Sequence, residues 1–175
     1  MAAIESTLDH PAHATHLFHM RLALQEAAKA TPEKTAFCVG ALLVDPQTTP
    51  YTLLSTGYSR ELPGNTHAEQ CCLERLGSIE RHTQDDMPIL DNVCAMYTTM
   101  EPCSERNSGN KSCVDRLIES GKIRTVYVGV REPDTFVKKN IAIERLREAG
   151  IDYIHVPGVE QECLEAATRG HDSQS

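Results

Sequence analysis

Two short stretches of the sequence carry residue types that bind metals and move protons. The first contains His67 and, two residues later, Glu69; the second contains Pro102-Cys103, followed by nine residues and then Cys113. One imidazole and two thiolates form a soft three-ligand set that suits Zn²⁺. Three protein ligands leave the fourth tetrahedral position open, which is typical of a catalytic zinc site. The pattern therefore predicts one zinc ion per chain, bound by His67, Cys103 and Cys113.

Glu69 has the position of a proton carrier beside that ion. It follows His67 at the start of an expected helix, so its carboxylate should point into the same site without binding the metal. Zinc lowers the pKa of bound water from about 15.7 to about 7, and a helix N-terminus favours negative charge beside it. A carboxylate there can take a proton from water and deliver it to a leaving amine, worth roughly 10²–10⁴-fold in rate. These residues predict a hydrolytic deamination with Glu69 as the catalytic carboxylate.

Alternating helices and strands must position these residues. Hydrophobic periodicity, apolar runs and turn residues predict them along the whole chain. We expect helices at 16–30, 68–81, 113–120, 138–149 and within 159–170, and strands at 37–44, 51–58, 93–99, 125–130 and 151–156.

The order of these elements indicates the fold class. The second half reads as two β-α-β units, which need right-handed crossovers and parallel strands, and Gly121 and Gly150 stand where left-handed helix caps are favoured. The first half reads as a hairpin added to the same sheet. We therefore predict an α/β fold: a three-layer helix/sheet/helix sandwich around a mixed five-stranded sheet.

Composition limits the classes of function. The chain has 175 residues, a length that fits one domain. Its net charge of −8 argues against nucleic acid as the main partner. No apolar run approaches the ~20 residues that span a bilayer, and the N-terminus lacks signal-peptide features. Seven cysteines, an odd number, favour reduced thiols. We expect a cytoplasmic protein with no membrane partner, a flexible leader at 1–14, one domain at 15–170 and a polar tail at 171–175.

The motifs resemble those of a known enzyme family. His-x-Glu followed by Pro-Cys is similar to nucleobase and nucleoside deaminases, which continue as Pro-Cys-x-x-Cys. Here nine residues separate Cys103 from Cys113, and this longer spacing resembles the deaminases of riboflavin biosynthesis, nearest to the fungal form. Further stretches of the resemblance, which runs from about residue 20 to 159, are Val39-Gly40-Ala41, Gly57-Tyr58, Thr99–Ser104, Gly121–Val130 and Ala149-Gly150-Ile151.

The resemblance implies a substrate and an assembly. The reaction would hydrolyse 2,5-diamino-6-ribitylamino-4(3H)-pyrimidinone 5′-phosphate to 5-amino-6-ribitylamino-2,4(1H,3H)-pyrimidinedione 5′-phosphate and ammonia. A cytidine-deaminase-like fold and a homodimer or higher homo-oligomer are also implied. Bacterial relatives have a substrate-contacting Asn where Ala36 stands and a substrate-contacting His where Ser59 stands. They also continue into a reductase domain that this chain is too short to contain, so we expect another protein to reduce the ribose.

Substrate contacts are expected around the loop between the two cysteines, which is crowded with hydrogen-bond donors. A phosphorylated pyrimidine needs such donors, and Arg106 or Lys111 could meet its phosphate. A plain solvated loop is the alternative for each of these residues. The other candidates for substrate contact are Asn65, Ala68, Ser104 and Asn107.

Two other functions remain open from the sequence. A deaminase of cytosine, cytidine or RNA bases would share the zinc chemistry, but the nine-residue spacing and the charge of −8 count against it. A non-catalytic zinc module would follow if Cys71 or Cys72 closed the site as a fourth ligand. Their positions after Glu69 favour core packing, and a structural site gains nothing from that carboxylate. His10, His13, His16 and His19 recur every three residues without an evident thiol or carboxylate partner for a second metal site.

Overall fold

The computed structural model describes residues 13–82, 90–133 and 139–171. In chain order the elements are α1 (His13–Ala27), β1 (Gly40–Asp45), β2 (Thr52–Tyr58), α2 (Ala68–His82), β3 (Cys94–Met100), α3 (Cys113–Ser120), β4 (Ile123–Val130), α4 (Ala142–Glu148), β5 (Asp152–His155) and α5 (Glu160–Ala167). Each element expected from the sequence is present. Helix α1 starts inside the expected leader, of which residues 1–12 lie outside the described part. Of the expected polar tail, residues 172–175 lie outside it too.

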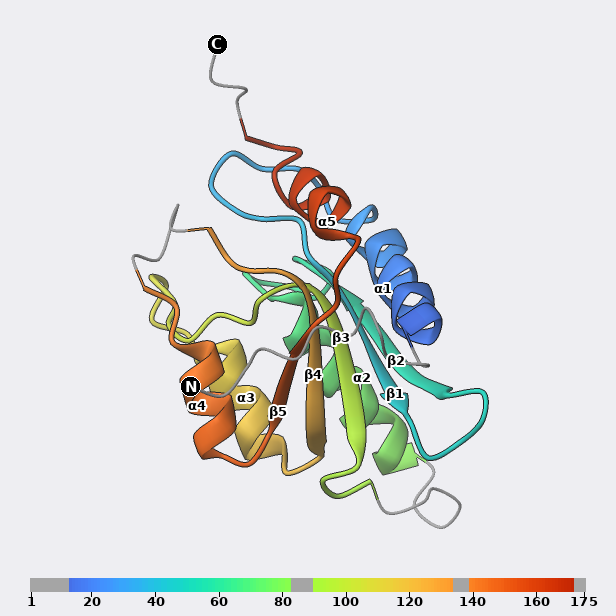
Figure 1. Cartoon of the computed structure of the whole chain (residues 1–175). Coiled ribbons are helices and arrows are strands. Elements are labelled where there is room, and N and C mark those ends of the chain that lie inside the picture. The colour runs from blue at the N-terminus through green and yellow to red at the C-terminus, as the bar shows by residue number, and fades with distance from the viewer. Residues whose placement is uncertain (1–12, 83–89, 134–138, 172–175) are drawn as a thin grey trace.

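The five strands form one mixed sheet in the order β2-β1-β3-β4-β5 (Figure 1). Strand β1 is antiparallel to both β2 and β3, whereas β3, β4 and β5 run parallel. A hairpin is therefore joined to a parallel half, as the sequence predicts. Because β3 and β4 are parallel, the segments that follow them leave the sheet at the same edge, which is where the candidate site lies.

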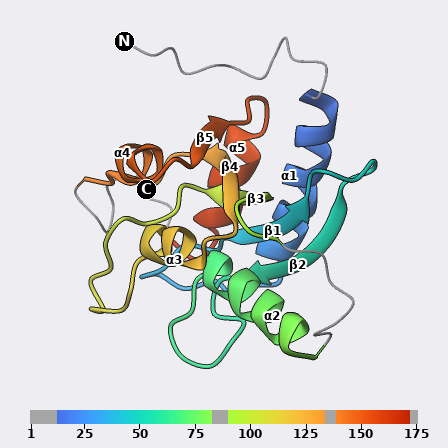
Figure 2. The same ribbon diagram turned by 90° about the horizontal axis from the view of Figure 1, so that it is seen from below.

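Helices cover both faces of the sheet, which gives the expected three layers. On one face α2, α3 and α4 pack in a core with residues such as Leu43, Leu76 and Leu117. On the other face α1 and α5 pack in a core with Met20 and Tyr97. Figure 2 shows α1 and α2 on opposite sides of β1 and β2. Strand β1 is buried along its whole length because its alternating side chains enter the two cores in turn.

Strand β2 passes very close to the start of α2 at Gly57. A Cβ atom there would lie 2.4 Å from the carbonyl oxygen of Ala68 and 2.9 Å from the backbone nitrogen of Cys72. Both are backbone atoms that cannot rotate away, so only glycine allows this approach. The contact fixes the first turn of α2, which carries Glu69.

Replacing Gly57 with alanine is expected to destabilise the fold and shift the start of α2. Overpacking of this kind costs about 1–3 kcal/mol, and each kcal/mol lowers Tm by roughly 2–4 °C in a chain of this size. Thermal unfolding followed by circular dichroism measures the change. Gly77→Ala is the matched control, because the nearest atom to its Cβ is the mobile end of Arg81 at 3.5 Å. An unchanged Tm in Gly57→Ala would contradict the close packing.

Candidate active site

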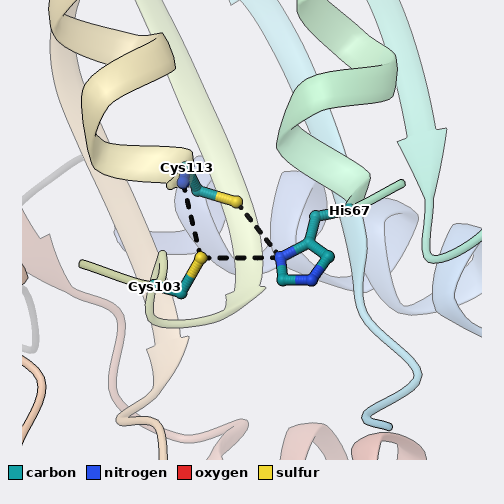
Figure 3. A group of neighbouring side chains, drawn as sticks. All are labelled: His67, Cys103 and Cys113. Carbon is teal, nitrogen blue, oxygen red and sulfur yellow. Dashed lines mark hydrogen bonds between the residues drawn. The ribbon is translucent and has the colours of Figure 1, made fainter. Parts of the chain in front are cut away.

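Three sulfur and nitrogen donors meet at the edge of the sheet where β3 ends (Figure 3). His67 immediately precedes α2, Cys103 follows β3 by three residues, and Cys113 is the first residue of α3. The Nδ1 atom of His67 lies 3.6 Å from the Sγ atom of Cys103 and 3.3 Å from that of Cys113. Ser112 caps α3 by accepting a hydrogen bond from the backbone N–H of Asp115, which holds Cys113 at the helix start.

The three donors match a tetrahedral zinc ion in type and in spacing. Zinc–sulfur bonds of about 2.3 Å and zinc–nitrogen bonds of about 2.0–2.1 Å place neighbouring sulfur and nitrogen ligands about 3.6 Å apart. Within the described ranges, His67, Cys103 and Cys113 are the only group of three or more His, Cys, Asp or Glu residues arranged to hold a metal ion. The thiol of Cys71 instead points to the carbonyl oxygen of Tyr58, and Cys72 lies in the core.

The electrostatics of the two cysteines favour a thiolate at this point. The pKa of the Cys103 thiol is lowered, first by its hydrogen bond with Cys113 and then by His67. The pKa of the buried Cys113 thiol is raised by the same pairing and by burial. The backbone N–H of Cys113 also points at the Cys103 sulfur, at 3.4 Å. Because the thiolate is the form that binds metals, the lowered pKa of Cys103 favours the binding of a cation by Cys103 and Cys113.

Glu69 lies beside the three donors and is almost fully buried, with 3% of its surface exposed. Its Oε1 atom is 3.1 Å from the Thr98 hydroxyl, and its Oε2 atom is 3.4 Å from the Cys113 sulfur. Burial, partly offset by His67, raises the pKa of its carboxyl. A carboxyl with a raised pKa accepts and returns a proton near neutral pH more readily than an exposed one. Thr98 was missed by the sequence analysis, although a polar residue in a fully buried strand is a usable signal.

A cavity of about 500 Å³ opens onto these groups and brings part of the expected substrate set together. His67, Glu69 and Cys103 line it, and Asn65, Arg106 and Asn107 line it as well. Ala36 and Ser59, which stand where bacterial relatives have substrate-contacting residues, are also lining residues. The cavity is large enough for a nucleotide-sized ligand.

Three expected substrate contacts point elsewhere. The side chain of Ala68 is fully buried in the core. The Ser104 hydroxyl accepts the backbone N–H of Ile141 at 3.1 Å, which anchors the start of α4. Lys111 forms an ion pair with Glu119 and lines a separate groove along α2 and α3.

Several lining residues were not singled out from the sequence. Glu33 and Phe37 come from the segment before β1, and Glu132 comes from just past the end of β4. Burial raises the pKa of Glu132 to about 8, with smaller contributions from Cys103, Glu101 and Glu69. Its position after a parallel strand beside β3 is a signal that could have found it, since ligands bind at the carboxyl ends of parallel strands.

The four regularly spaced histidines of the N-terminal region do not form a metal site within the described residues. The His16 Nδ1 atom lies 2.8 Å from the Tyr97 hydroxyl, and the His19 ring stacks on the Tyr97 ring at 5.0 Å between centroids. His10 lies outside the described residues. The described helices include none that is long and apolar enough to cross a membrane.

Residues 13–130 match the cytidine and deoxycytidylate deaminase zinc-binding region. The chain belongs to this deaminase family. The expected cofactor, zinc, and the expected cytidine-deaminase-like fold are therefore confirmed. The matched residues include the region from His67 to Cys113, which contains the candidate active site.

The chain is also similar to individual deaminases of known name. It is 42% identical over 156 residues to the diaminohydroxyphosphoribosylamino-pyrimidine deaminase of Schizosaccharomyces pombe, covering 89% of this chain and 36% of that one. The chain thus spans about a third of that relative. It is also similar to the crystal structure of the Aspergillus oryzae Rib2 deaminase in complex with DARIPP, with 38% identity, a TM-score of 0.76, and 90% and 92% of the two chains covered.

A bacterial structure shows the same fold. The Thermotoga maritima diaminohydroxyphosphoribosylaminopyrimidine deaminase/5-amino-6-(5-phosphoribosylamino)uracil reductase is 27% identical, with a TM-score of 0.70. The match covers 90% of this chain and 40% of the bacterial one. The resemblance to fungal deaminases of riboflavin biosynthesis, inferred from the motifs, is confirmed.

Proposed function

We propose that this deaminase hydrolyses the 2-amino group of 2,5-diamino-6-ribitylamino-4(3H)-pyrimidinone 5′-phosphate in riboflavin biosynthesis. One observation carries the proposal: His67 and Cys103 of the His/Cys/Cys donor group line a single cavity together with the buried Glu69. The S. pombe relative is a deaminase of a phosphorylated diaminopyrimidine, and the Aspergillus structure holds DARIPP. Both support a phosphorylated diaminopyrimidine as the substrate, and DARIPP supports the ribityl form.

The roles of the site residues follow from their positions. His67, Cys103 and Cys113 would hold the zinc ion, which when bound supplies the charge that makes a water molecule acidic at neutral pH. Glu69 takes a proton from the attacking water and delivers it to the 2-amino nitrogen. A C2–O bond forms, the bond between C2 and the amino nitrogen breaks, and that nitrogen leaves as ammonia. The second proton of the water ends on a ring nitrogen next to C2, so that C2 becomes a carbonyl carbon. The Thr98 hydroxyl, 3.1 Å from Glu69, orients the carboxylate throughout.

Recognition of the substrate falls to residues on the cavity wall. Asn65 and Asn107 offer amide groups to the pyrimidinone and the ribityl chain. The guanidinium of Arg106 contacts the carbonyl oxygen of Asn65 and the amide oxygen of Gln70, both neutral. Its charge therefore favours an anion such as the substrate phosphate.

Arg106→Gln is expected to raise the KM for the phosphorylated substrate by about tenfold or more, because a charge-assisted hydrogen bond is lost. Turnover of the unphosphorylated pyrimidine should hardly change, since it lacks the anion. Lys111→Gln is the matched control from the same loop, because Lys111 pairs with Glu119 outside the cavity. Steady-state ammonia release measures both. Equal effects of the two substitutions would contradict the role of Arg106.

The proposed function is tested by offering the zinc-loaded protein a set of pyrimidines. The set contains the ribityl and ribosyl pyrimidinone phosphates, their unphosphorylated forms, cytidine and cytosine, and ammonia release is measured for each. We expect turnover of the ribityl phosphate above all others. If the protein deaminates cytidine but none of the pyrimidinone phosphates, the proposal is overturned in favour of a cytidine deaminase.

We further propose a cytoplasmic homodimer or higher homo-oligomer with its deaminase domain at residues 15–170. All seven cysteines are free and buried, which suits a reducing compartment. The elements from α1 to α5 share two continuous cores, which supports one domain. The resemblance to oligomeric deaminases supports self-association. Light scattering after size-exclusion chromatography tests the assembly.

A further inference from the structure

One wall of the substrate cavity is an irregular segment between α1 and β1, residues 31–38, here called the wall segment. Its residues Glu33, Thr35, Ala36 and Phe37 all line the cavity. Its β-type backbone pairing consists of one isolated bridge, between Glu33 and Ala36. A segment with so little ladder structure needs outside contacts to keep one conformation.

The stretch from the last residue of α5, Ala167, to His171 supplies such contacts along the length of the wall segment. The carbonyl oxygen of Ala167 accepts the backbone N–H of Cys38 at 2.9 Å. Nη2 of Arg169 donates to the carbonyl oxygens of Ala27, at 2.9 Å, and Ala30, at 3.0 Å, just before the segment. These bonds hold both ends of the wall segment to residues that lie far away in sequence.

The middle of the wall segment is held by His171 and Gly170. Nε2 of His171 donates to the carbonyl oxygen of Ala36 at 3.2 Å, and its ring lies 5.2 Å from the Phe37 ring. A Cβ atom on Gly170 would lie 2.3 Å from the backbone nitrogen of Glu33 and 2.5 Å from its carbonyl oxygen. The two backbones are in direct contact, and glycine is the residue that allows it.

We propose that residues 167–171 are a positioning clamp that sets the wall segment and thereby the affinity for substrate. This inference rests on the proposed function, because it assigns a wall to that substrate cavity. The clamp bonds to residues 27, 30, 36 and 38, whereas Glu69 and the zinc donors lie at the start of α2 or just before it, at the start of α3, and after β3. Its loss should therefore weaken substrate binding and leave the chemical step intact. Arg60 also donates to the carbonyl oxygens of Thr31 and Phe37, so the wall keeps part of its support.

The first test replaces Gly170 with alanine in the zinc-loaded protein. The added Cβ must displace the backbone of Glu33, so we expect KM for the ribityl pyrimidinone phosphate to rise about tenfold with kcat within about twofold. Zinc content should stay at one ion per chain. Gly77→Ala, on α2, is the matched control, because the atom nearest to its Cβ is the mobile end of Arg81 at 3.5 Å. An unchanged KM, or a fall in kcat with KM unchanged, would overturn the clamp.

Two further measurements keep the proposal testable. Arg169→Gln removes the bonds to Ala27 and Ala30 without adding an atom near Glu33, and it should raise KM in the same way, with Arg169→Lys restoring part of the affinity. Hydrogen exchange of the 31–38 amides should be faster in Gly170→Ala and Arg169→Gln and unchanged in Gly77→Ala. Unchanged exchange in both clamp variants would overturn the proposal. If the unsubstituted protein turns over none of the pyrimidinone phosphates, the proposed function fails, and exchange alone decides whether the clamp exists.

Discussion

Glu69→Gln is expected to reduce ammonia release from the ribityl pyrimidinone phosphate by about 10²–10⁴-fold, the usual contribution of a positioned general acid–base. The amide keeps the size of the side chain and its place beside Thr98, but it can neither accept the proton of water nor return it to the leaving nitrogen. The loss should fall on kcat with little change in KM, because the interaction acts on the reacting atoms.

Zinc content and folding separate this loss from damage to the site. Since the donor group consists of His67, Cys103 and Cys113, Glu69→Gln should still bind one zinc ion per chain and unfold at a similar temperature. Glu74→Gln is the matched control, because Glu74 lies one turn further along α2, where it accepts a hydrogen bond from Gln70 outside the cavity. Full activity in Glu69→Gln would remove Glu69 from the mechanism.

The elements of the fold were predictable because their signals are local. Helical spacing, apolar runs and the caps at Gly121 and Gly150, both with positive φ in the structure, need only neighbouring residues. The donor group was predictable for a different reason. His67 and Cys113 stand at helix starts and Cys103 follows a strand, so the sheet topology alone brings them to one edge.

The cavity wall was not predictable in the same way, because it depends on which distant segments meet. Arg106 and Lys111 lie in one polar loop and are equivalent in sequence, yet only Arg106 faces the cavity while Lys111 turns to Glu119. The wall segment takes its conformation from contacts more than a hundred residues away, such as the bond from His171 to Ala36. No periodicity within 31–38 records such a contact.

The spacing of the histidines in α1 shows what a sequence motif alone does not determine. Repetition every three residues placed His16 and His19 on one side of α1, which a metal site would also need. Among the described residues, their ring neighbours include Tyr51, Tyr97 and Tyr127, which belong to the core between α1 and the sheet. Spacing sets which side chains share a face, whereas the partner across the interface decides their chemistry.

Cys113→Ala is expected to abolish both zinc binding and deamination. Replacing a residue that only hydrogen-bonds to a metal ligand lowers the metal affinity by about 10–100-fold. Replacing a direct ligand should lower the metal affinity further. The Cys113 thiol is fully buried against His67 and Glu69, and alanine leaves no donor in its place. Metal analysis after reconstitution and dialysis, together with ammonia release, measures the effect.

Cys72→Ala is the matched control for this experiment, and it also tests the alternative of a structural zinc module. Cys72 is as buried as Cys113 and lies in the neighbouring core, where burial raises the pKa of its thiol well above the usual range. A thiol held in its protonated form is a poor ligand, so Cys72→Ala should keep its zinc and its activity while losing some stability. Zinc retained by Cys113→Ala but lost from Cys72→Ala would mean that His67, Cys103 and Cys113 are not the ligand set.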